Sequence, residues 1–271
     1  MPFAICNEIY EGWSLADACA HAARSGYDAL ELAPFTLASR ITDLGAADRA
    51  RIRKTVEASG LKVAGLHWLL AKTEGFHVTH PDPALRLRTS EYLRALVDAC
   101  ADMGGTILVF GSPKQRSLQP GVAPGQAWEW ATQCLGDAVK QAEDRGVTFC
   151  VEPLAPSETD FLNTAADARR FAAQFRSPAA KILLDVKAMS AESTPIPQII
   201  RESAGHFAHF HANDPNLKGP GFGDVDFKPI AEALHGVEYR GYVSVEVFLF
   251  DEGADVIARR SRENLRAAFG N

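Results

Sequence analysis

Short apolar runs alternate with longer, helix-like segments along the chain. In the clearest helix-like segment, apolar residues recur every three or four positions, as they do along one face of a helix: Leu93, Leu96, Val97, Cys100 and Met103. The same periodicity predicts further helices near residues 14–24, 46–58, 124–145, 164–176, 195–204, 226–236 and 252–268. The apolar runs between them predict strands at 3–6, 29–32, 63–67, 106–110, 147–151, 181–184, 207–210 and 242–245.

The order of these elements predicts the fold class. A glycine precedes several of the strands, for example Gly60 and Gly146, where its tolerance of a left-handed backbone ends a helix. The strands are apolar almost throughout, which is typical of a parallel sheet covered by helices. Eight strand and helix pairs in a chain of this length indicate an α/β fold, a (β/α)₈ TIM barrel, with residues 1–271 as a single catalytic domain. A doubly wound sheet is the alternative.

Composition narrows the class of protein. The chain has 271 residues, 46% of them hydrophobic, which is ample for a large core. Its five cysteines show no C-x-x-C spacing, so we expect reduced thiols, and the absence of an apolar leader or spanning segment leads us to expect a cytoplasmic protein with no membrane partner. A net charge of −6 disfavours nucleic acid, so we expect a small-molecule partner.

Four polar side chains stand at the carboxyl ends of consecutive predicted strands. Glu152, Asp185, His211 and Glu246 end the fifth to eighth strands, and in a TIM barrel these ends form the active face. Three carboxylates and one imidazole form a mostly hard ligand set that suits Mn²⁺, Mg²⁺ or Co²⁺. The alternative is that each acid is solvated or paired with a cation, but four on consecutive strands favour a metal site.

Three more residues are candidates, and two of them, His67 and Glu158, have two interpretations each. His209 shares a face with His211 and lies farther from the loop, so we expect it to be structural. His67 ends the third strand and either contacts substrate or packs beside Trp68. Glu158 follows the fifth strand and either binds a substrate hydroxyl or belongs to a helix start.

Basic residues occur near the same predicted rim. Lys114 and Arg116 follow the fourth strand, and Lys187 lies two residues after Asp185. These cations either hold an anionic substrate or are simply solvated. The glycine-rich run 219–223 does not match a phosphate-binding loop and is better interpreted as a lid.

Several motifs together resemble a known family. They are Glu152-Pro153-Leu154, Glu158-Thr159-Asp160, Leu162-Asn163-Thr164, Asp185, His211-Ala212-Asn213-Asp214, Pro220-Gly221-Phe222-Gly223 and Val245-Glu246. In this order they resemble the xylose-isomerase-like sugar (phosphate) isomerase and epimerase superfamily, nearest the ketose 3-epimerases of the tagatose and allulose type. The similarity extends over essentially the whole chain.

The resemblance implies a mechanism and a set of roles. One divalent ion, with Mn²⁺ favoured and Co²⁺ or Mg²⁺ as alternatives, would be held by Glu152, Asp185, His211 and Glu246. The two glutamates would transfer a proton beside the substrate carbonyl through a metal-stabilised enediolate. Substrate contacts are expected from Glu158, His67, Lys187, Lys114, Arg116 and Asn213. Family members are often homodimers or homotetramers.

Two departures from the family pattern leave the substrate open. Ala188 stands where those epimerases carry a histidine, and Leu217-Lys218 stand near the position of an arginine. The lysines instead suggest an acidic, phosphorylated or oxidised sugar. A metal-dependent lyase or decarboxylase, with Lys187 holding a carboxylate, is therefore the second hypothesis.

Two other classes remain as alternatives. An endonuclease-IV-like DNA repair enzyme shares the fold, but the acidic chain has no basic stripe for duplex phosphates. A non-catalytic binding or scaffold protein is also consistent with the fold, since fold alone does not determine function. It would bind no metal at the four candidate ligands.

Overall fold

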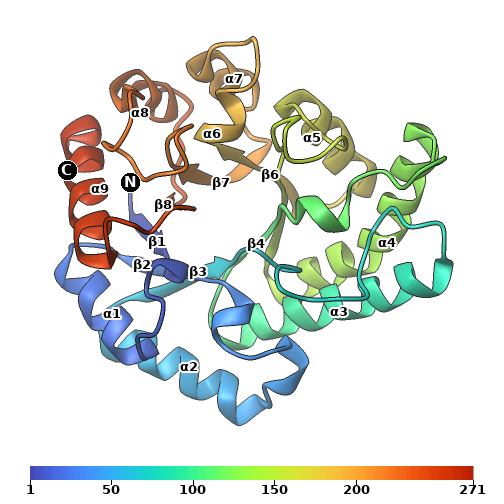
Figure 1. Cartoon of the computed structure of the whole chain (residues 1–271), viewed down its shortest axis with the longest axis horizontal. Coiled ribbons are helices and arrows are strands. Elements are labelled where there is room, and N and C mark those ends of the chain that lie inside the picture. Colours follow the sequence, from blue (N-terminus) through green and yellow to red (C-terminus); the bar gives the residue numbers. More distant parts are fainter. Residues whose placement is uncertain (271) are drawn as a thin grey trace.

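The computed structural model describes residues 1–270 and shows a closed barrel of eight parallel strands inside a ring of helices (Figure 1). The strands are β1 (Phe3–Cys6), β2 (Ala29–Leu32), β3 (Lys62–Leu66), β4 (Ile107–Phe110), β5 (Thr148–Val151), β6 (Ala180–Asp185), β7 (Phe207–Ala212) and β8 (Val243–Val245). Each strand pairs with its sequence neighbour, and β8 pairs with β1. The predicted TIM barrel is confirmed, and the doubly wound alternative is wrong.

Helices cover the outside of the barrel. They are α1 (Leu15–Arg24), α2 (Ala46–Ala58), α3 (Pro83–Asp102), α4 (Pro124–Arg145), α5 (Ala165–Ala172), α6 (Val186–Met189), α7 (Ile196–Glu202), α8 (Phe227–Gly236) and α9 (Ala254–Phe269). Short 3₁₀ turns occur at η1 (Asn7–Ile9), η2 (Pro34–Thr36), η3 (Ile41–Asp43), η4 (Pro113–Gln115) and η5 (Ala173–Phe175). All eight predicted helices are present, and α6 is an addition.

Side-chain caps explain where several helices begin. The Ser14 hydroxyl accepts a hydrogen bond from the Asp17 amide at the start of α1, and Thr164 does the same for the Asp167 amide at the start of α5. Such caps satisfy backbone donors that a helix start leaves unpaired. Helix α5 is shorter than predicted, because the chain tightens into η5 and turns at Arg176, whose φ is +51°.

The inside of the barrel is apolar along part of the strands and polar at the carboxyl ends of the strands. Phe3 and Ile5 of β1 pack into the main core between strands and helices, whereas Ala4 between them joins a separate cluster with Ala29 and Ala64. Alternate side chains of a strand point to opposite faces, so this cluster lies inside the barrel. A second inner cluster contains Ile107, Val109, Cys150 and Leu183. Polar side chains replace these apolar layers at the carboxyl ends of the strands.

Two further expectations can be compared with the described part of the chain. All five cysteines are free and buried, as expected of packing residues. Within residues 1–270, no helix combines the length and the apolarity that crossing a bilayer would require.

Candidate metal centre and active site

The four predicted metal ligands come together at one end of the barrel. Glu152 follows β5, Asp185 and His211 belong to β6 and β7, and Glu246 follows β8. All four side chains are buried, and one donor atom from each lies within 4.8 Å of the others. Neighbouring parallel strands end at the same edge of a barrel, which is why residues so far apart in sequence meet here.

The carboxylates oppose one another's ionisation. Burial, followed by repulsion from Glu246 and Asp185, raises the pKa of Glu152 to about 8. Burial and the Glu246 charge raise the pKa of Asp185 to about 6. Burial also opposes ionisation of Glu246, but His211, whose Nδ1 lies 3.1 Å from Glu246 Oε2, lowers the pKa of that carboxyl overall.

This donor set fits a divalent cation. Three buried carboxylates in mutual contact carry more negative charge than the imidazole beside them can balance, and a bound cation would relieve that repulsion. Oxygen-rich sets of this kind suit Mn²⁺, Mg²⁺ or Co²⁺. Glu152, Asp185, His211 and Glu246 are therefore the residues that could hold such an ion.

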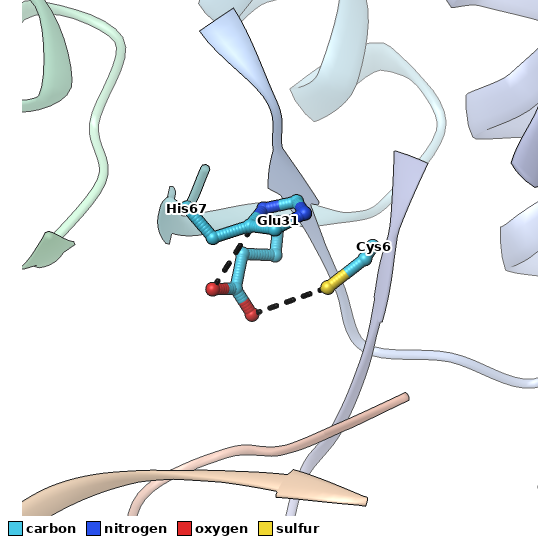
Figure 2. Close-up of side chains that lie close together, drawn as sticks. All are labelled: Cys6, Glu31 and His67. Carbon is cyan, nitrogen blue, oxygen red and sulfur yellow. Dashed lines mark hydrogen bonds and ion pairs between the residues drawn. The ribbon is translucent and has the colours of Figure 1, made fainter. Parts of the chain in front are cut away.

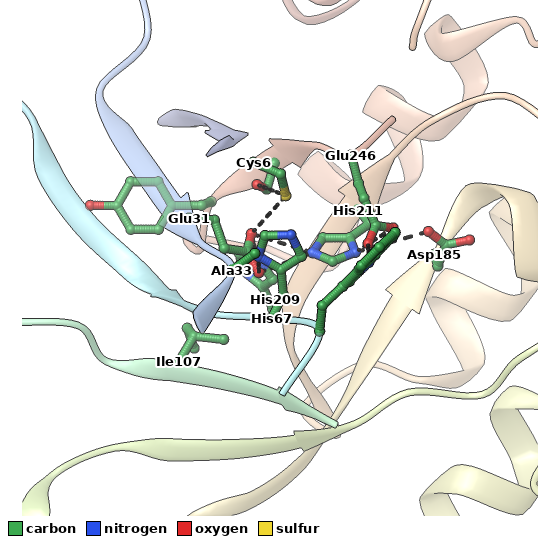
Figure 3. A network of polar contacts seen from close by, with 12 residues as sticks. Cys6, Glu31, Ala33, His67, Ile107, Asp185, His209, His211 and Glu246 are labelled. Atoms are coloured by element: carbon green, nitrogen blue, oxygen red, sulfur yellow. Dashed lines mark hydrogen bonds and ion pairs between the residues drawn. The ribbon is translucent and has the colours of Figure 1, made fainter. Parts of the chain in front are cut away.

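A buried network underneath orients His211. Its Nε2 lies 3.1 and 3.3 Å from the two carboxylate oxygens of Glu31 on β2, and the other ring nitrogen faces Glu246 (Figure 3). His209 Nε2 lies 2.7 Å from the same carboxylate, so the expected structural role of His209 has a partner. Although burial disfavours a charge on Glu31, these two histidines hold its pKa well below the ordinary range.

His67 belongs to this network and does not line the cavity above it. Its side chain is fully buried, with Nε2 2.9 Å from Glu8 Oε2 and Nδ1 3.9 Å from Glu31 Oε1. Figure 2 shows His67 and Cys6 on either side of Glu31, and the Cys6 thiol donates to Glu31 Oε2 at 3.7 Å. The structure thus favours the packed interpretation of His67 over a substrate contact.

Two of the four candidate ligands, Glu152 and Glu246, line a cavity of about 360 Å³. Trp68 lines it with them, and the indole of Trp68 donates a hydrogen bond to Glu246 Oε1 at 2.7 Å. Such a volume lies within the range of small-molecule sites, about 300–1,000 Å³. The candidate proton-transfer residues are therefore accessible from one enclosed space.

Three of the predicted substrate-binding residues line this cavity. Lys187 Nζ lies 2.7 Å from Glu158 Oε1 and 4.4 Å from the ring centroid of Phe248. Lys114 also lines the cavity, and its side chain is exposed. Lys187 is thus held in an ion pair, whereas Lys114 is solvated.

Arg116 does not lie on the rim as predicted. Its side chain is fully buried, and its guanidinium donates hydrogen bonds to the carbonyl oxygens of Glu152 at 2.6 Å and Leu162 at 3.4 Å. Burial lowers its pKa to about 10. The prediction that Arg116 lies on the rim is wrong, because its guanidinium forms hydrogen bonds with buried backbone carbonyl groups after β5.

Asn213 forms hydrogen bonds with Asp185 and with the backbone of Lys187. Its amide nitrogen donates to Asp185 Oδ2, and its amide oxygen accepts from the Lys187 backbone amide at 2.8 Å. Asp185 also accepts from the Ala188 amide at 2.7 Å and so caps α6. Asn213 is fully buried, so its contacts position Asp185 rather than reach into the open cavity.

The sequence interpretation missed Glu31, Glu8 and Trp68. Glu31 is a lone acid near the carboxyl end of the otherwise apolar strand β2, a signal similar to the one that identified Glu152 and Glu246. Glu8 lies in η1 after β1 and Trp68 follows β3, where no strand periodicity marks them. The signal for Glu31 was available in the sequence, and those for the other two were not.

Gly111 explains how Glu152 is accommodated. A Cβ placed at Gly111 would collide with Glu152 Oε2. Any larger residue at this position would force the Glu152 carboxylate to move from its place in the centre.

The fold and the donor set define a TIM-barrel protein with a candidate centre for one divalent cation. The chain belongs to the Xylose isomerase-like TIM barrel family, which it matches over residues 19–268. The resemblance found in the sequence motifs is therefore confirmed at the level of the family.

Named relatives are sugar epimerases. The chain is 26% identical over 239 residues to the L-ribulose 3-epimerase of Methylomonas sp. (strain DH-1), covering 87% of this chain and 80% of that enzyme. It is 34% identical over 122 residues to the D-psicose 3-epimerase of Ruminiclostridium cellulolyticum, which covers 45% of this chain and 42% of that enzyme. These relatives support an enzyme of the sugar isomerase and epimerase class.

A solved structure has the same fold. The D-psicose 3-epimerase of Clostridium cellulolyticum H10, solved with D-tagatose, superposes with a TM-score of 0.86 at 22% identity, covering 99% of each chain. At that identity the match concerns the fold alone.

Proposed function

We propose that this protein is a divalent-metal-dependent epimerase or isomerase of a ketose or related sugar, and that Glu152 and Glu246 transfer the proton. One observation carries the proposal: these two carboxylates come from strands on either side of β6 and β7 and line the same cavity, beside Asp185 and His211. Inversion of a carbon next to a carbonyl is served by two such groups, one that removes the proton and one that returns it to the opposite face.

Each residue of the centre has a defined task in this proposal. A divalent cation, with Mn²⁺ favoured by the hard donors, would polarise the sugar carbonyl and stabilise negative charge on its oxygen. Glu246 is oriented by the Trp68 indole and His211, and it removes the proton. Glu152 lines the same cavity and returns the proton to the other face of the carbon.

The Lys187 and Glu158 ion pair is proposed to bind sugar hydroxyls. Both residues line the cavity, and together they offer a donor and an acceptor at the wall. Ala188, at the position of the family histidine, is 3% exposed and has no polar side chain to offer. Lys187 next to it can supply the missing hydrogen-bond donor.

The same ion pair weakens the lyase hypothesis. That hypothesis required Lys187 to hold a substrate carboxylate, but its ammonium already lies 2.7 Å from a carboxylate of the protein. A second carboxylate would have to compete with Glu158 for the same charge. A hydroxyl-rich neutral sugar fits the paired arrangement better.

The proposal is tested with paired isosteric variants. Glu152→Gln and Glu246→Gln, loaded with Mn²⁺, are compared with the wild type for conversion of a panel of free ketoses to their epimers. We expect turnover to fall by about 10²–10⁴-fold in each variant, as when a general acid or base is removed. Circular dichroism checks that both variants remain folded.

Lys114→Met serves as the control. Lys114 lines the cavity but is exposed and far less constrained than the glutamates, so we expect its loss to change turnover by no more than a few-fold. Wild-type turnover in both glutamate variants would rule out the proposed proton transfer.

A further inference from the structure

A second cavity of about 390 Å³ lies beside the first. The two share three lining residues, Trp68, Lys72 and Phe248. The rings of Trp68 and Phe248 are stacked, with centroids 5.9 Å apart and an angle of 27° between their planes. The two cavities therefore adjoin at this pair, which forms a wall common to both.

Several aromatic rings line the second cavity. Besides the shared pair, its lining includes Tyr10, Trp13, Phe35 and Phe250. The Tyr10 hydroxyl lies 3.2 Å from Nδ1 of His21, so it is already paired, and the ring rather than the hydroxyl is available to a ligand. Rings of this kind bind planar apolar groups by stacking and edge contacts.

Two of the polar side chains that line this cavity, Asn7 and Glu8, are buried. Asn7 donates to Thr36 Oγ1 at 2.8 Å and accepts from the Ala33 amide at 2.8 Å. Glu8 is 5% exposed; its Oε2 lies 2.9 Å from His67 Nε2, but its Oε1 has no hydrogen-bond partner within residues 1–270. A buried oxygen left in this state favours a ligand that donates a hydrogen bond to it.

Two of the residues shared by both cavities, Trp68 and Lys72, have an unusual backbone conformation. Trp68 and Lys72 have φ of +52° and +56°, in the left-handed region that side chains other than glycine seldom adopt. Strain of this kind persists where the surrounding structure imposes it, and it concentrates at functional sites. Trp68 is in addition fixed by its hydrogen bond to Glu246, which ties the wall directly to the candidate proton-transfer residue.

We propose that the second cavity is a subsite for an apolar, planar substituent carried by the substrate sugar. We call it the aromatic subsite and define it by Tyr10, Trp13, Phe35, Phe250 and Glu8. The sugar occupies the first cavity, its substituent passes the Trp68 and Phe248 wall, and Glu8 accepts a hydrogen bond from a hydroxyl near the junction. The inference rests on the proposed function and specifies its substrate class as a sugar conjugate rather than a free sugar.

Volume supports the conjugate over the free sugar. The first cavity alone reaches the size of ordinary small-molecule sites, about 300–1,000 Å³, and it contains both proton-transfer glutamates. A free sugar bound there would leave the adjoining aromatic walls uncovered. A substituent of similar breadth to one or two rings would cover them.

The test uses two matched compounds: a ketose that the enzyme epimerises, and the same ketose with a benzyl ether on the hydroxyl farthest from its carbonyl. Both are assayed with the Mn²⁺-loaded enzyme by deuterium incorporation from D₂O. We expect kcat/KM to be at least about tenfold higher for the benzyl ether, the size expected of aromatic contacts. In Trp13→Ala and Phe250→Ala this preference should fall to within about twofold.

Trp130→Ala is the matched control, because Trp130 lies on α4, outside both cavities, and stacks with the Arg86 guanidinium. It should keep the wild-type preference. Equal kcat/KM for the two compounds in the wild type would overturn the aromatic subsite while leaving the epimerase proposal intact.

A binding measurement separates the two proposals. Saturation-transfer NMR on the wild type and Trp13→Ala reports contact between the protein and the benzyl protons without any turnover. Contact that is lost in Trp13→Ala supports the subsite even where neither compound reacts, a result that would count against the epimerase. Absence of contact in the wild type would overturn the subsite.

Discussion

At the scale of single residues, Glu31 determines the orientation and the tautomer of the His211 ring. The carboxylate lies 3.1 Å from His211 Nε2, while Nδ1 of the same ring faces Glu246 and Asp185. An imidazole that donates Nε2–H to a carboxylate keeps the lone pair of Nδ1 free for a cation. Glu31 therefore sets both the tautomer and the direction of the candidate metal ligand.

Replacement of Glu31 should weaken metal binding. In Glu31→Gln the ring of His211 loses its charged acceptor, and we expect the affinity for Mn²⁺ to fall by about 10–100-fold. Isothermal titration calorimetry measures this directly. Glu192→Gln, which changes a carboxylate that caps α5 through the Ala165 amide, is the control and should bind as the wild type does. Unchanged affinity for Mn²⁺ in Glu31→Gln would show that Glu31 does not prepare His211 for metal binding.

Glu152 makes the stability of the metal-free protein depend on pH. Burial and the neighbouring acids raise its pKa from an ordinary 4.5 to about 8, so the folded state binds this proton more tightly than the unfolded state does. The resulting stabilisation is complete below pH 4.5 and is lost as pH rises to 8. We expect the free energy of unfolding in urea with EDTA to fall over this range more steeply in the wild type than in Glu152→Gln.

Parallel pH profiles for the two proteins would contradict the raised pKa of Glu152. Measurements at three pH values between 5 and 8 are sufficient, because a single proton changes the slope by at most about 1.4 kcal/mol per pH unit.

At the scale of elements, the loop after β4 is fastened to the end of β5. Arg116 follows η4 and donates to the carbonyl oxygens of Glu152 and Leu162, both buried. The backbone that carries Glu152 therefore depends on a side chain from the preceding βα unit. These hydrogen bonds explain why Arg116 is buried although the loop that carries it lies at the rim of the barrel.

Arg116→Met should destabilise the fold. The buried Glu152 carbonyl oxygen would lose its donor, at a cost of about 1–3 kcal/mol, so we expect about that loss of stability in urea unfolding. The Leu162 carbonyl oxygen keeps its hydrogen bond from the Leu154 amide at 3.1 Å. Lys114→Met, two residues earlier and exposed, should change stability by less than about 0.5 kcal/mol. Equal stability of the two variants would show that Arg116 has no anchoring role.

Among the helices, those with long periodic patterns were predictable, and the shortest one was not. Helices α3 and α4 have 20 and 22 residues, enough for the apolar stripe to repeat many times. Helix α6 has 4 residues, and its start depends on Asp185, which sequence alone presented as a metal ligand. Periodicity cannot detect a single turn whose capping residue has a second role.

At the scale of the whole molecule, counting strands was enough to predict the barrel and the common position of the four candidate ligands. Strand order in a TIM barrel follows chain order, so Glu152, Asp185, His211 and Glu246 had to lie side by side. The contact between Glu31 and His209 joins residues 178 positions apart and crosses the inside of the barrel. Chain order does not specify which inward side chains meet there, and this is why the buried network was missed.

The central claim is that this barrel moves a proton beside a sugar carbonyl. The most direct test incubates the Mn²⁺-loaded wild type with ketoses in D₂O and follows the carbon-bound protons by NMR. We expect deuterium at the carbon next to the carbonyl, without release of CO₂ or of an eliminated fragment, and we expect none in Glu246→Gln. Release of CO₂ or a fragment would identify a lyase, and absence of exchange with every ketose, free or benzylated, would contradict the proposed function.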